Sequence, residues 1–77
     1  MIDLKAAIKN APKGATHMIV VCDTFDHDDY PVYVKKGQHV REIEAEYNGK
    51  NMQCVMEVYN LKKSIKKQLA EHRSFNY

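Results

Sequence analysis

Residues Met18 to Cys22 form an unbroken apolar run in which β-branched side chains predominate. A run of that length and type is typical of a β-strand covered on both faces, rather than of an amphipathic helix. A second short apolar run follows at Val32 to Val34, and the residues between the two runs include four aspartates and a histidine: Asp23, Asp26, His27, Asp28 and Asp29. We therefore predict a central strand that leads into a hairpin with an acidic tip.

Three other segments have the apolar spacing of helices, because their apolar side chains recur every three or four positions. They lie at residues 4–11, 38–47 and 61–72, although an extended interpretation of residues 41–45 stays open for the second. Residues 52–59 instead alternate as a strand does. The predicted order is α-β-β-α-β-α in one α+β domain of residues 1–77. A three-stranded antiparallel sheet with the helices packed on one face is the economical arrangement.

The size of the chain bears on its oligomeric state. A chain of 77 residues buries only about 60 to 65 % of its unfolded surface, so its core is marginal. The third predicted strand is rich in Met, Val and Tyr and offers a pairing surface to a second copy. We therefore expect a homodimer.

The two cysteines and the hydropathy pattern indicate the compartment. Cys22 and Cys54 lie inside predicted strands, where a free cysteine behaves as a small apolar residue, and no secretory segment precedes them. No apolar segment approaches the roughly 18 residues of a membrane span. We expect a soluble cytoplasmic protein that does not bind a membrane, with unpaired thiols.

The residues that catalysis requires are not arranged for it. Both serines lack flanking glycines, and Gly14, Gly37 and Gly49 are isolated, which excludes a nucleophile elbow, a P-loop and a dinucleotide fingerprint. The aspartates of the tip do not have the spacing of an EF-hand, and no close Cys or His pair indicates zinc. We therefore expect no enzymatic activity, no catalytic residue, no cofactor and no metal site. Metal-dependent hydrolysis at the acidic loop stays open as an alternative.

Two groups of side chains are candidates for binding. Acidic tips suit basic partners, and tyrosine is enriched where a surface is apolar but must also form hydrogen bonds. Tyrosines at alternating positions of the second and third strands would add to such a surface if they lay on an exposed sheet face. The candidate partner-binding residues are Asp26, Asp28, Asp29, Tyr30, Tyr33 and Tyr59.

The C-terminal segment has the opposite charge and forms the second group. A lysine stripe on the last helix could bind phosphates, and the candidate anion-binding residues are Lys62, Lys63, Lys66 and Arg73. This charge distribution can steer a partner or favour head-to-tail self-association. Nucleic acid is a weaker candidate ligand than a small anion, because base recognition usually adds arginines and exposed aromatic residues.

The run from Ala11 to Val34 resembles small hypothetical proteins of tailed bacteriophages and prophages. The resemblance implies a viral protein made in the cytoplasm of an infected bacterium, in a gene class that supplies inhibitors of host enzymes and antagonists of host defence. Our leading hypothesis is therefore a non-enzymatic phage accessory module that binds and inhibits a host defence or nucleic-acid-processing protein. The alternative is a homo-oligomer that sequesters a small anionic ligand such as a signalling nucleotide.

Overall fold

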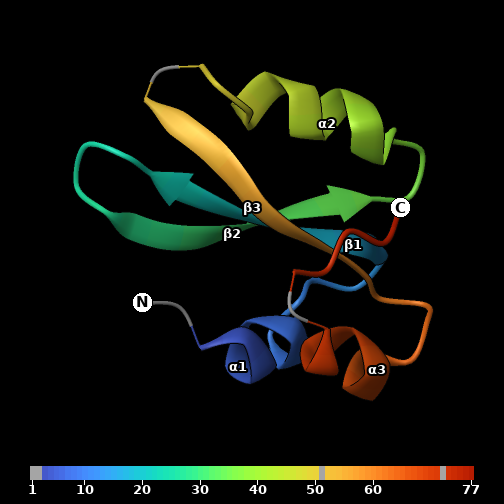
Figure 1. The fold of residues 1–77 in the computed structure, drawn as a ribbon. Coiled ribbons are helices and arrows are strands. Elements are labelled where there is room, and N and C mark those ends of the chain that lie inside the picture. The colour runs from blue at the N-terminus through green and yellow to red at the C-terminus, as the bar shows by residue number, and fades with distance from the viewer. Residues whose placement is uncertain (1–2, 51, 72) are drawn as a thin grey trace.

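The computed structural model describes residues 3–50, 52–71 and 73–77. The predicted α-β-β-α-β-α order and the three-stranded antiparallel sheet of the α+β class are confirmed, and the strands lie in the order β2-β1-β3 (Figure 1). The elements are α1 (Leu4–Lys9), β1 (Ala15–Asp23), β2 (Asp28–Lys35), α2 (Val40–Tyr47), β3 (Gln53–Asn60) and α3 (Ile65–Ala70).

Side-chain caps fix where the two short helices begin. The Asp3 carboxylate accepts a hydrogen bond from Ala6 N at 3.1 Å, and the Ser64 hydroxyl accepts one from Lys67 N at 3.4 Å. Such caps satisfy N–H groups that have no partner inside the first turn. Gly14 follows α1 with a φ of 89°, a conformation that glycine adopts without strain, and the chain turns there into β1.

The expectation that the helices pack on one face of the sheet is wrong, because they cover both faces. In Figure 1, α2 lies on one side of the sheet, and α1 and α3 lie on the other. The central strand explains this arrangement, since successive side chains of a strand point to opposite faces. Met18 and Val20 pack in a core with α1 and α3, whereas Ile19 and Val21 pack in a core with α2. All four are buried, so each face of β1 requires a cover.

The C-terminal residues lie against the outer edge of β3. Val58 N donates to Ser74 O at 2.7 Å, and Asn76 N donates to Val58 O at 2.9 Å, so that Phe75 and Val58 form a parallel bridge. The guanidinium group of Arg41 on α2 lies over the ring of Tyr77, with its Cζ atom 4.0 Å from the ring centroid. The tail thus forms a single β-bridge at this edge.

Side chains cover further parts of both sheet edges. The buried amide of Gln68 accepts a hydrogen bond from Asn60 N at 2.7 Å and donates to Asn60 O at 2.8 Å. Val55 N donates to the side chain of Asn48 at 3.3 Å. On the opposite edge, β2 contains Pro31, which has no N–H to offer. The β3 edge is therefore occupied at Val55, Val58 and Asn60, and Pro31 interrupts the row of donors on the β2 edge.

No helix in residues 3–50, 52–71 and 73–77 is long and apolar enough to cross a membrane.

Candidate functional site

The hairpin tip, residues 23–29, is held in a defined conformation. The Asp23 carboxylate accepts hydrogen bonds from Phe25 N at 2.9 Å and from Asp26 N at 3.3 Å. The backbone N and the hydroxyl of Thr24 both donate to Met52 O, at 2.7 Å and 2.6 Å. These contacts fasten the loop to the chain that enters β3. The tip is therefore a projection from the end of the sheet that hydrogen bonds hold in place.

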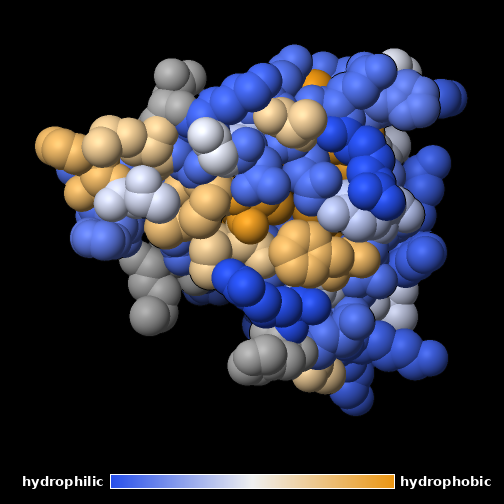
Figure 2. Space-filling view, turned by 45° about the horizontal axis from the view of Figure 1, so that its top comes forward, coloured by the Kyte–Doolittle hydropathy of each residue, from blue (hydrophilic) through white to orange (hydrophobic). Residues whose placement is uncertain are grey.

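This projection combines an apolar centre with acidic neighbours. The Phe25 side chain is 71 % exposed and Met52 is 62 % exposed, while Asp26 and Asp28 are also exposed. Figure 2 shows apolar surface at the hairpin end of the molecule, on the left, next to strongly hydrophilic surface. Phe25 is not among the candidate residues predicted from the sequence. The available signal was an aromatic residue inside a polar turn, where no predicted strand or helix would bury it.

The acidic candidates divide into two environments. Asp26 lies in the loop and Asp28 begins β2 opposite Asp23, and both are exposed, whereas Asp29 is half-buried and stands opposite Cys22 in the pairing of β1 with β2. A hydrogen bond to Asp29 raises the pKa of the Cys22 thiol, and burial adds to that effect. A raised thiol pKa disfavours the thiolate, so Cys22 is a poor nucleophile.

The expectation of a tyrosine-bearing exposed sheet face is wrong, because helices cover both faces. Tyr59 is 1 % exposed and its hydroxyl donates to the Glu57 carboxylate at 2.9 Å. Burial raises the pKa of Tyr59 strongly, followed by the contribution of Glu57. Tyr33 is half-buried and donates its hydroxyl hydrogen to Ala7 O at 2.7 Å, which joins β2 to α1.

Tyr30 lies next to the tip and has a structural role on the opposite face. It packs against the core that β1 forms with α2, and its hydroxyl accepts a hydrogen bond from the Gln53 amide. Burial raises the pKa of this phenol, with a further contribution from Tyr47. Of the six candidate partner-binding residues, only Asp26 and Asp28 are exposed.

The structure places the two thiols next to each other. Cys22 and Cys54 are directly paired across β1 and β3, and both are half-buried free cysteines. The Cys54 sulfur also contacts the Met56 sulfur at 3.8 Å. In the described ranges, no three residues among His, Cys, Asp and Glu are grouped so that they could hold a metal ion.

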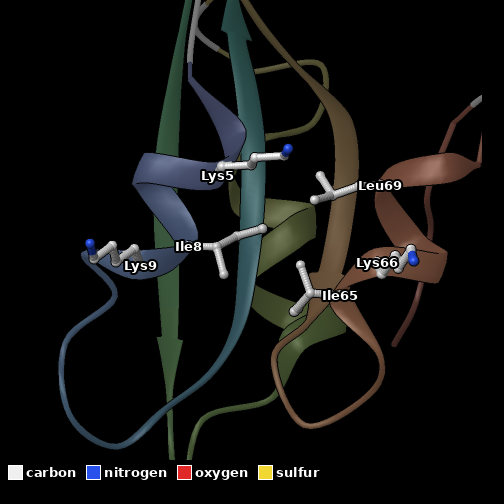
Figure 3. A pocket seen from close by; sticks show the side chains of 6 residues that line it. All are labelled: Lys5, Ile8, Lys9, Ile65, Lys66 and Leu69. Carbon is white, nitrogen blue, oxygen red and sulfur yellow. The ribbon is translucent and has the colours of Figure 1, made fainter.

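A second surface feature lies between α1 and α3. It is an open groove of about 470 Å³, in which Ile8 faces Ile65 and Leu69 (Figure 3). The other lining residues are the lysines Lys5, Lys9 and Lys66. Lys5 and Lys9 were not singled out from the sequence, although their spacing of four places them on one face of α1.

The four candidate anion-binding residues have different neighbours. Lys66 lines the groove. The charges of Lys62 and Lys63 instead affect His17: burial is the main cause of its lowered pKa, and these two lysines lower it further. The Arg73 guanidinium lies 3.6 Å from the sulfur of Met56. Among the residues that the structure describes, no aromatic side chain lines the groove, so these residues offer a nucleotide base nothing to stack on.

Comparisons with protein-family models, with curated proteins and with solved structures give no match, so the geometry of the chain itself is the basis for interpreting its function.

Proposed function

We propose that this protein is a non-enzymatic binding module whose hairpin tip engages a basic surface of a partner protein. The observation that carries the proposal is the position of Phe25. Its ring is 71 % exposed, and carboxylates flank it. The loop that carries it is held by hydrogen bonds from Phe25 N to the Asp23 carboxylate and from the Thr24 hydroxyl to Met52 O. A large aromatic side chain in water on a braced loop has no role in the core of its own fold.

The physical chemistry of the tip suits protein recognition. Aromatic side chains that enter a pocket on a partner dominate the energy of many interfaces. The loop is already ordered by Asp23 and Thr24, so binding costs less conformational entropy than it would for a mobile loop. The exposed carboxylates of Asp26 and Asp28 would steer a positively charged partner and set its orientation.

The partner would therefore carry an apolar pocket surrounded by lysines or arginines. Proteins that bind nucleic acids expose such basic surfaces to contact phosphates. A module that occupies that surface would exclude the nucleic acid and inhibit its partner. With the resemblance to phage proteins, the partner would be a bacterial defence or nucleic-acid-processing protein.

The test is a comparative capture experiment from bacterial lysate with four forms of the immobilised protein. They are the wild type, Phe25→Ala, Asp26→Asn with Asp28→Asn, and a control with Glu42→Gln and Glu46→Gln. The control removes the same number of negative charges from exposed positions on α2.

We expect one protein to be captured by the wild type and by the control, to be lost with Phe25→Ala, and to bind the double-asparagine form more weakly. Binding to the wild type should weaken as salt is raised from about 0.05 to 0.5 M, because exposed charges are then screened. The same set of captured proteins for all four forms would contradict the proposal.

A further inference from the structure

The groove between α1 and α3 specifies the chemistry of what it can bind. Its floor is apolar, formed by Ile8, Ile65 and Leu69, and lysine side chains surround it (Figure 3). The two helices with their adjoining loops, residues 3–13 and 60–71, carry seven lysines against only two carboxylates, Asp3 and Glu71. A suitable occupant therefore combines one compact apolar group with several negative charges.

The hairpin tip of this same chain has that composition. Residues 23–29 contain four aspartates and no lysine or arginine, and they surround an exposed phenylalanine ring. We propose that the groove receives the tip of a second copy of this protein. Phe25 would lie over the apolar floor, and the carboxylates of Asp26 and Asp28 would face the lysines of the rim.

The contact has to form between molecules. The loop between β1 and β2 comprises residues 24–27 alone, and its first residue is hydrogen-bonded to Met52 O. Such a short, fastened loop cannot fold back over the helices of its own chain. Association through the sheet edges is the competing route; Gln68 and the C-terminal tail occupy parts of the β3 edge, and Pro31 interrupts the β2 edge.

Each copy has one tip and one groove, so the contact is heterologous. Two copies can exchange tips reciprocally and close a dimer, or successive copies can form an open chain. The contact area of a loop tip is small beside the roughly 1,600 Å² of a standard protein interface. We therefore expect association that depends on protein concentration and weakens with salt.

The tip is also the surface used in the proposed function, so the inference rests on that function in this respect. The groove is a separate surface, and this permits an independent test. A tip occupied by a second copy would be unavailable to another protein, so self-association would compete with partner binding.

Sedimentation velocity on the full chain, over a range of concentrations, tests the inference through charge reversal. The groove variant carries Lys5→Glu and Lys66→Glu, and the tip variant carries Asp26→Lys and Asp28→Lys. All four positions are exposed, so the fold should tolerate the changes. Circular dichroism of each variant checks this directly.

Each variant alone should associate at least about tenfold more weakly than the wild type, because the reversal places like charges opposite each other. The matched controls are Lys36→Glu with Lys50→Glu, and Glu42→Lys with Glu46→Lys, which reverse exposed charges elsewhere. Both controls should associate like the wild type.

Mixing supplies the decisive result. The tip variant keeps a native groove and the groove variant keeps a native tip, so an equimolar mixture should form pairs held by one native contact. The remaining tip, which carries lysines, and the remaining groove, which carries glutamates, also have opposite charges, so the mixture should recover the association that each variant alone has lost. A wild type that is monomeric at every concentration, or a mixture with no pairs, would overturn the inference.

The capture experiment separates the two proposals. If the groove variant still captures the partner while no form self-associates, only the further inference fails. If Phe25→Ala abolishes self-association but leaves every captured protein in place, the inference stands and the proposed function fails.

Discussion

Replacing the buried Gln68 should destabilise the protein more than any surface substitution on α3. Its side-chain amide accepts from Asn60 N at 2.7 Å, donates to Asn60 O at 2.8 Å, and donates to Ser64 O at 3.2 Å. The side chain is 3 % exposed, so water replaces these bonds poorly. Through them Gln68 holds the end of β3 and the start of α3 together.

The cost follows from these three hydrogen bonds. Gln68→Met keeps a similar volume but removes all of them, at about 1 kcal/mol each, with an added cost of about 1 to 3 kcal/mol where a backbone group stays buried and unpaired. Since Asn60 is only half-buried, we expect a loss of about 2 to 4 kcal/mol. At roughly 0.05 to 0.15 kcal/mol per residue, a chain of this length is stable by about 4 to 12 kcal/mol. The substitution should remove a large part of that.

Gln68→Glu adds a pH test of the same geometry. Near neutral pH the introduced carboxylate can accept from Asn60 N, but it cannot donate to the two carbonyl oxygens. Burial and those carbonyls should raise its pKa in the folded state above the ordinary value of about 4.3. The neutral form then stabilises the fold below the unfolded-state pKa, and this contribution is lost as pH rises through the folded-state pKa.

Urea unfolding followed by circular dichroism, at several pH values, measures both effects. The deficit of Gln68→Glu relative to the wild type should be largest near pH 7 and should shrink as the pH falls toward about 4. Gln68→Met should show a deficit with no such trend. Wild-type stability for Gln68→Met, or a constant deficit for Gln68→Glu, would refute the assignment of these hydrogen bonds.

Three further predictions concern the core, the tail and the half-buried His17. Ile19→Ala, at a fully buried position facing α2, should lower the free energy of unfolding by about 2 to 5 kcal/mol in urea titration, and a change under 1 kcal/mol would contradict that packing. Asn76→Pro should cost about 1 kcal/mol more than the control Asn76→Ala, because only proline removes the N–H that donates to Val58 O; equal stabilities would argue against the bridge between the tail and β3. The lowered pKa of His17 means that the unfolded state binds its proton more tightly. Stability should therefore fall as the pH drops below the ordinary value of 6.5 and level off below the folded-state pKa, and His17→Asn should flatten that slope in unfolding measured across pH.

The element order follows from the sequence because each element has a strong local signal. The β-branched run predicted at 18–22 is the centre of β1, and the alternation at 52–59 corresponds to β3. Asp3 caps the start of the first helix, and Pro12 and Gly14 follow its end. These signals depend on neighbours within a few residues, which a sequence displays directly.

The arrangement of the layers was beyond such local patterns. Val40 and Ile43 mark an apolar face of α2, but nothing in their spacing states which face of the sheet they meet. The unbroken apolar run of β1 was the available signal, since it requires cover on both sides. Because the spacing did not show that a helix covers its face of the sheet, Tyr59 was expected on an exposed face, but it lies in a core.

The candidate site shows the same division. The exposed acidic residues at 26 and 28 were predictable, because charges in a turn stay in water. The groove was not, because Lys5 and Lys66 are distant in sequence and meet only when α1 and α3 pack side by side. The contact of Phe75 with Val58 is likewise a product of tertiary structure.

The position of β1 between two cores has a consequence for how the molecule unfolds. Met18 and Ile19 are adjacent residues that belong to opposite cores, and both are fully buried. Separation of either helical layer would expose one side of a strand whose other side anchors the second layer. The two layers should therefore melt in a single cooperative transition, with probes placed near α2 and near α3 reporting the same midpoint.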